Sequence, residues 1–133
     1  MINWKYEKPH PRAKAIEASH RSGIYENKPW TTGDNLLVDD LPVEVRENVL
    51  AWVRQSVLPS SYVNPHRTSY GIKHLLQHET GIYLTNNQFK DAMLLCGFLP
   101  ANRTKIDWEY RIKERSPAFI RERERNYGGV VNK

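Results

Sequence analysis

Residues 70–98, YGIKHLLQHETGIYLTNNQFKDAMLLCGF, contain two short helical patterns separated by a glycine and a three-residue apolar run. The first pattern places Ile72, Leu75 and Leu76 on one face, at the spacing of an amphipathic helix. The second pattern repeats that spacing with the apolar residues Phe89, Ala92, Met93 and Cys96. Because the connection is short, the two helices are expected to pack against each other, which predicts a helix-turn-helix arrangement.

Residues that cap helices stand at the ends of both patterns. They are Thr68 or Ser69 and Gly81 for the first helix, and Thr85 or Asn86 and Gly97 for the second. Gln88 stands three residues after Thr85, which is the spacing of a capping box. The apolar run between the helices, residues 82–84, is expected to form a very short strand.

A further helix is predicted before this pair, over residues 41–58. Asp40 is a candidate N-cap, Pro42 suits the first turn, and Pro59 would stop the helix. An apolar stripe at helical spacing supports this assignment and contains Val45, Val49, Trp52 and Val53. The residues that follow, 62–69, are expected to be a connector.

After the pair, residues 105–114 alternate between apolar and charged side chains, which is the strongest strand pattern in the chain. One face of this strand would contain Ile106, Trp108, Tyr110 and Ile112. The predicted order is therefore helix, helix, short strand, helix, strand, with residues 82–84 pairing with residues 105–114. Residues 99–102, or the segment after Lys113, would supply a further strand. The expected fold class is α+β, mainly α.

We divide the chain into an arm, a domain and a tail. Residues 1–40 are expected to form an extended, partly helical arm, because prolines and turn residues interrupt them. Four aromatic residues would pack this arm onto the main body or onto a second copy: Trp4, Tyr6, Tyr25 and Trp30. Residues 41–118 form the predicted domain, and residues 119–133 a basic, flexible tail.

Residues 86–112, NNQFKDAMLLCGFLPANRTKIDWEYRI, resemble the closing segment of winged-helix modules of phages and plasmids, including those at the C-terminus of viral primase-helicases. In that family a helix of the pattern F-x-x-x-L/M ends in G-F or G-Y, and a basic turn and an aromatic strand follow. Residues 66–98 also look like small proteins of Gram-positive phages and prophages. The resemblance covers roughly residues 60–118 and implies a winged helix-turn-helix-like domain of mobile-element origin. It implies no catalytic residue, and helicase activity is not carried over because the chain has no ATP-binding loop.

In a helix-turn-helix, the start of the last helix enters the major groove of DNA. That start contains Thr85, Asn86, Asn87, Gln88 and Lys90, and the amide side chains suit an adenine edge. The start of the preceding helix would contact phosphates through Arg67, Thr68, Ser69, Tyr70 and Lys73. The alternative is that these residues are ordinary caps and solvated helix faces.

The charge distribution favours the C-terminal part of the chain as a further phosphate contact. The formal net charge is +5, and residues 103–133 contain nine basic and five acidic residues. Candidate contacts there are Arg103, Lys105, Arg111, Lys113, Arg115, Arg121, Arg123 and Arg125. The alternating run at residues 121–125 is more typical of a solvated helix face held by local pairs. Specific DNA binders contact about six to ten phosphates, so tight binding is predicted to require a homodimer.

Two functional hypotheses follow from these patterns. The first is an accessory protein of a phage or mobile element that binds double-stranded DNA, in regulation or replication. The alternative is a protein-interaction module that inhibits a host protein, such as a CRISPR effector or another defence factor. Aromatic residues concentrate at interface hot spots and favour the alternative, whereas the basic charge favours DNA.

We expect no enzyme activity, cofactor or metal. The chain has no phosphate-binding glycine loop, nucleophile elbow or metalloprotease helix pattern. His74 and His78 have the spacing of metal ligands, but further ligands would have to come from Cys96, Glu79 or His66 without a second ligand pair. The single cysteine, the lack of a signal-peptide pattern and the short apolar runs predict a cytoplasmic protein of the host bacterial cell.

Overall fold

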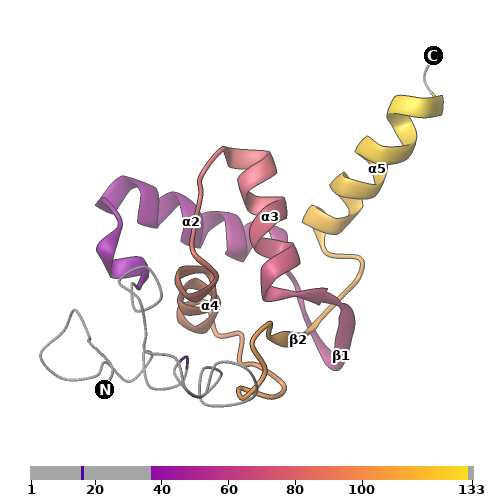
Figure 1. Ribbon diagram of the computed structural model, residues 1–133. Helices are drawn as coiled ribbons and strands as arrows, with labels where there is room; N and C mark the ends of the chain where they lie inside the picture. Colours follow the sequence, from indigo (N-terminus) through magenta and orange to yellow (C-terminus); the bar gives the residue numbers. More distant parts are fainter. Residues whose placement is uncertain (1–15, 17–36, 132–133) are drawn as a thin grey trace, which may run out of the picture.

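The computed structural model describes Ile16 and residues 37–131, and the elements are shown in Figure 1. The described part is α+β and mainly helical, with one two-stranded antiparallel sheet. Of the predicted arm, only Ile16 and residues 37–40 are described, and Ile16 is fully buried in the core. The four aromatic residues expected to pack the arm lie outside the described residues.

The elements follow in the order η3 (Val38–Asp40), α2 (Val43–Ser56), β1 (Pro59–Thr68), α3 (Ser69–Thr80), α4 (Asn86–Leu95), β2 (Glu109–Ile112) and α5 (Pro117–Val131). Helix α4 packs against both α2 and α3, and η3 packs against α4 and α2. The sheet lies at one end of this group, and α5 leads away from the group towards the C-terminus (Figure 1). None of the described helices is both long and apolar enough to cross a membrane.

Helix α2 confirms the helix predicted from residue 41 and buries the predicted stripe, including Val49, Trp52 and Val53. The N-cap position is Pro42, so the expectation that Asp40 would cap this helix is wrong. A carboxylate oxygen of Asp40 instead accepts a hydrogen bond from the backbone N–H of Leu37 at 2.7 Å, which closes η3. Helix α2 therefore begins directly after Pro42, whose φ of −54° is close to the value in an α-helix.

Local capping determines the ends of α3 and α4 as predicted. Thr68 is the N-cap of α3, and Gly81 ends that helix in the left-handed conformation with φ of 79°. Thr85 and Gln88 form a capping box at the start of α4. The predicted inner stripe of α4 is buried at Phe89, Ala92 and Met93, and Cys96 is half-buried.

The strand predicted at residues 82–84 is wrong, because these residues form an irregular connection between α3 and α4. The partner of β2 is β1, in the stretch that the sequence analysis treated as a connector. Asn64 stands opposite Tyr110 and Thr68 opposite Glu109, with register shifts on both sides of Asn64. Irregularities of this kind let an edge strand accommodate prolines, which are the residues that made this stretch look like a loop.

Strand β2 is shorter than the predicted strand over residues 105–114, but its alternation is confirmed. Trp108, Tyr110 and Ile112 are buried, whereas Arg111 is exposed. On the side of β2 away from β1, Pro100 forms an isolated antiparallel bridge with Tyr110. The Ala101 N–H also donates to the carbonyl of Glu109 at 2.9 Å. Residues 99–102 therefore supply the further pairing segment as a single bridge rather than a strand.

The segment expected to be a flexible tail from residue 119 is instead part of helix α5. Ala118 and Phe119 are fully buried and attach the first turn of α5 to the core. Ser116 precedes the helix, and its hydroxyl accepts a hydrogen bond from the Leu58 N–H at 2.9 Å. The sequence did not indicate this attachment because its partners are far away in the chain.

Candidate nucleic-acid interface

The leading turn of α4, expected to read bases, is occupied by contacts within the protein. The hydroxyl of Thr85 accepts from the Gln88 N–H at 3.0 Å, and the side-chain oxygen of Gln88 accepts from the Thr85 N–H at 3.1 Å. The side-chain amide of Gln88 also donates to the carbonyl of Leu37 at 3.4 Å. Thr85 and Gln88 therefore form the capping box of α4, and Gln88 also bonds to Leu37, the residue before η3.

The two asparagines at this helix start are also covered. Asn87 has 4% of its surface exposed, and Asn86 is half-buried. The side-chain amide of Asn86 donates to a carboxylate oxygen of Asp107 at 3.1 Å and to the carbonyl of Ile106 at 3.4 Å. Asn86 thus ties α4 to the loop that precedes β2.

Lys90 and Asp91 lie inside the protein. The Lys90 ammonium is 4.9 Å from the centroid of the Trp108 ring, and burial lowers the pKa of Lys90 to about 8. A carboxylate oxygen of Asp91 accepts a hydrogen bond from the Val38 N–H at 2.8 Å. Because Leu37 and Val38, at the start of η3, bond to Gln88 and Asp91, a base edge could bond to Gln88 only if this segment moved away.

Before α3, the guanidinium of Arg67 is engaged by two carboxylates. It bonds to Glu114 at 2.6 Å and to Glu122 at 2.5 Å, and it lies 4.2 Å from the centroid of the Phe119 ring. Burial alone would lower the pKa of Arg67, but the hydrogen bonds to Glu114 and Glu122 outweigh it and raise that pKa. A guanidinium held on two sides and stacked on a ring is not free to bind phosphate.

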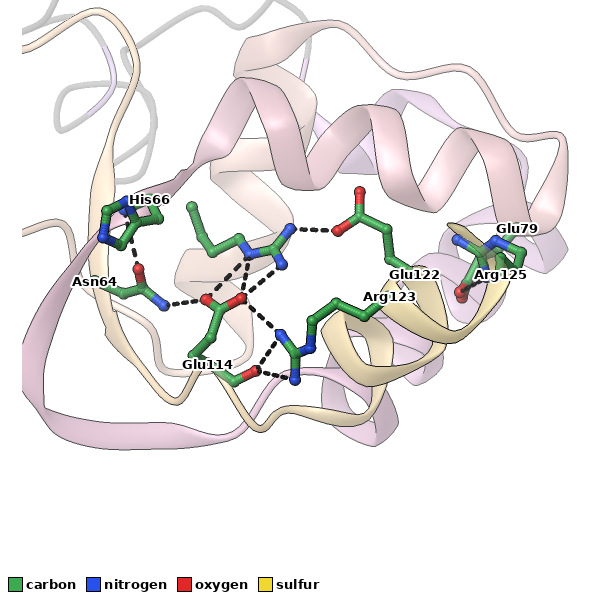
Figure 2. Close-up of polar contacts among 8 residues, drawn as sticks. Asn64, His66, Glu79, Glu114, Glu122, Arg123 and Arg125 are labelled. Carbon is green, nitrogen blue, oxygen red and sulfur yellow. Dashed lines mark hydrogen bonds and ion pairs between the residues drawn. The ribbon is translucent and has the colours of Figure 1, made fainter. Parts of the chain in front are cut away.

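The Glu114 carboxylate also accepts hydrogen bonds from residues other than Arg67, as Figure 2 shows. The side-chain amide of Asn64 donates to it at 2.9 Å, and Arg123 of α5 donates at 2.8 Å. Hydrogen bonding from Arg67 is the largest cause that lowers the pKa of Glu114. Glu114 therefore joins β1 and α5 through one carboxylate.

Glu79 has the same role at the other end of α3. It accepts from the indole N–H of Trp52 at 2.9 Å, from Arg121 at 2.8 Å and from Arg125 at 2.9 Å, and Figure 2 shows Arg125 against it. Burial raises the pKa of Glu79, but the three donors together lower it to about 2. The arginines of the alternating run are thus paired with distant carboxylates, not with local partners as the sequence analysis expected. Sequence reasoning missed Glu79 and Glu114 because a single carboxylate carries no spacing pattern.

The remaining predicted residues of α3 have structural contacts. Thr68 accepts from the Gly71 N–H at 3.4 Å as the N-cap, and the buried hydroxyl of Ser69 accepts from the Trp108 N–H at 3.0 Å. Lys73 is 4% exposed and lies 5.4 Å from the ring centroid of Tyr70 and 5.0 Å from that of Tyr83. Lys73 differs from the others because its ammonium lies near two aromatic rings and forms no ion pair with a described residue.

Exposed cations without an acidic partner are few in the described chain. Within residues 37–126 they are Arg54, Arg103, Arg111, Lys113 and Arg115. Lys105, also predicted as a phosphate contact, lies 3.4 Å from a carboxylate oxygen of Glu109. Four of the five exposed cations therefore come from the segment that contains β2 and its flanking turns.

Arg111, Lys113 and Arg115 form what we call the basic strip. Strand alternation turns Arg111 and Lys113 away from the core, opposite to Tyr110 and Ile112. Lys113 and Arg115 border a shallow hollow, together with side chains of β1 that include Tyr62 and His66. Tyr62 is 80% exposed, so the strip stands beside an accessible aromatic ring.

The described residues do not assemble a metal site: no three histidine, cysteine or acidic side chains lie close enough there to hold an ion. His74 instead contacts the Tyr70 ring edge-on, with centroids 4.4 Å apart. The thiol of Cys96 lies 3.7 Å from the carbonyl of Leu50, and burial raises its pKa.

The whole chain was compared with models of protein families, with curated proteins and with solved structures, and none of the three comparisons found a match.

Proposed function

We propose that the protein is a winged helix-turn-helix-like accessory protein of a phage or mobile element, and that it binds the phosphate backbone of double-stranded DNA through the basic strip. The feature that carries this proposal is the strip itself: three exposed cations, one on β2 and two in the segment that leads to α5, without an ion pair among the described residues. The start of α4, which the sequence favoured as the reader, is not part of the proposed contact.

The order of the elements supports the winged-helix part of the proposal. Helix α2 is followed by a strand, two helices and a second strand that pairs antiparallel with the first. The bridge between Pro100 and Tyr110 adds a third, minimal pairing segment and leaves residues 101–108 as the loop of a small wing. The basic strip begins on β2, the strand that follows this loop, and continues past β2 towards α5, and the exposed Arg103 lies in the loop itself.

The number of available cations sets the expected strength of binding. Three cations neutralise about three phosphates, which corresponds to a slope of about −3 in log affinity against log salt concentration. Binding by one copy should therefore be weak, independent of base sequence, and lost as salt rises. A second copy would double the number of contacts, in line with the predicted homodimer.

Fluorescence anisotropy with a labelled 16-base-pair duplex of random sequence, between 50 and 200 mM salt, tests this proposal. The protein should lose roughly 40-fold in affinity across that range. The triple variant Arg111→Gln, Lys113→Gln, Arg115→Gln should bind weakly at 50 mM with a slope near zero.

A matched pair of single variants separates the strip from the general effect of net charge. Lys113→Gln and Arg54→Gln each remove one exposed, unpaired cation, but Arg54 lies on α2. Lys113→Gln should lower the slope by about one, and Arg54→Gln should leave it unchanged. Equal losses in the two variants, or a wild-type slope in the triple variant, would refute the strip as the contact.

A further inference from the structure

Three residues form a second surface feature, which we call the tyrosine–lysine cluster: Tyr70 and Lys73 from the first half of α3, and Tyr83 from the connection between α3 and α4. The Lys73 ammonium is within cation–π distance of both rings, at 5.4 and 5.0 Å. The rings are open to solvent, with Tyr70 51% and Tyr83 63% exposed, whereas Lys73 is 4% exposed. The cluster is thus an accessible aromatic surface with one cation at its base.

Lys73 has no acidic partner among the described residues. The face of α3 that it shares with Tyr70, His74 and Gln77 contains no carboxylate. Glu79, the one acidic residue of α3, is bonded to Trp52 and Arg121 instead. Burial lowers the pKa of Lys73.

A largely buried lysine whose ammonium has no anion beside it is unfavourable for folding, and two rings compensate for this only in part. A residue of this kind gains stability when a ligand brings the missing anion. An apolar side chain of similar length could replace Lys73 without leaving a described hydrogen-bond or ion-pair partner unsatisfied. We therefore interpret Lys73 as a residue that is retained for binding and is not required for folding.

The surroundings of Lys73 favour a protein ligand over a nucleic acid. A nucleic-acid backbone presents a row of phosphates and is normally met by several cations, but this cluster offers one. Tyrosine is enriched at the centres of protein–protein interfaces and among their hot spots. One positive charge between apolar rings matches one carboxylate on a partly apolar peptide.

We propose that the tyrosine–lysine cluster docks an acidic peptide segment of a partner protein, with a carboxylate of that segment bonded to the Lys73 ammonium and its neighbouring side chains packed on Tyr70 and Tyr83. This surface does not depend on the DNA-binding proposal, because it shares no residue with the basic strip. The two proposals can therefore fail separately.

Selection from a library of random heptapeptides displayed on phage tests the docking site without knowledge of the natural partner. Peptides selected on the full-length protein should each contain Asp or Glu and should bind the Lys73→Met variant at least tenfold more weakly. A selected peptide in which the matching amide replaces that carboxylate should lose roughly tenfold in affinity, as expected for a bond between charged groups.

Two further variants keep the test decisive. Lys73→Met should melt at the same temperature as the wild type or higher, because it removes a desolvated charge. Tyr83→Ala removes a mostly exposed ring and should weaken peptide binding, whereas Tyr62→Ala, an exposed tyrosine elsewhere, should not. Selection of no peptides above background, of peptides without acidic residues, or of peptides that Lys73→Met binds equally well would overturn the proposal. Displacement of the peptide by the 16-base-pair duplex would also overturn it, since the cluster would then be a phosphate site.

Discussion

Glu79 is the carboxylate through which α2, α3 and α5 are joined, so the variant Glu79→Gln tests how the C-terminal helix is held. Its side chain is 11% exposed and accepts hydrogen bonds from Trp52, Arg121 and Arg125. A glutamine can still accept from the Trp52 indole, so the substitution removes mainly the charge. The variant should therefore keep the fold and lose the part of the stability that depends on the two arginines.

The magnitude follows from the pKa of Glu79. A pKa lowered from 4.5 to about 2 corresponds to about 3 kcal/mol of folding free energy at neutral pH. The arginine side chains are 42% and 36% exposed, and solvent screening reduces the contribution of such pairs. We expect Glu79→Gln to lower the free energy of unfolding at pH 7 by about 1 to 2 kcal/mol.

The pH dependence gives an independent check on the sign. Because the folded pKa lies below the unfolded one, the contribution is complete above about pH 5 and is lost as the pH falls towards 2. Urea unfolding should therefore separate the wild type from Glu79→Gln at pH 7 and bring their free energies together near pH 2.

A control carboxylate is available on α2. Glu47 is 60% exposed and lies 3.7 Å from Arg46, so Glu47→Gln should change the free energy of unfolding by less than about 0.5 kcal/mol. The reasoning is refuted if Glu79→Gln unfolds like the wild type at pH 7, or if the difference between them is the same at both pH values.

Two other predictions concern a buried cation and a helix end. Burial lowers the pKa of Lys90 to about 8, so as the pH rises the folded protein loses this proton before the unfolded chain does. In urea titrations, the wild type should therefore gain stability relative to Lys90→Met as the pH rises from 8 to 10. A constant difference between the two proteins would contradict this. Gly81→Ala should cost about 1 kcal/mol because φ is 79°, although no atom lies within 4 Å of the added Cβ. Gly71→Ala, inside α3 and with normal backbone angles, should be neutral or stabilising in the same measurement.

The sequence alone determined the features that depend on neighbours within one or two turns. Thr68, Gly81, Thr85 and Gln88 act as predicted because a cap bonds to backbone atoms three or four residues away. The alternation that buries Trp108 is equally local, since successive side chains of a strand point to opposite faces. These features were sufficient to predict α2, α3, α4 and the mixed fold class.

Only the tertiary structure decided which side chains stay available for a partner. Gln88 and Lys90 are polar residues at a helix start, and their burial follows from η3 and Trp108, which are distant in sequence. Arg67 is likewise unavailable for a partner, because its guanidinium is paired with Glu114 and Glu122. Strand β1 was missed because its pairing depends on β2, more than forty residues later. A residue type sets what chemistry a side chain can perform, but exposure depends on which distant segments meet, and no local pattern contains that information.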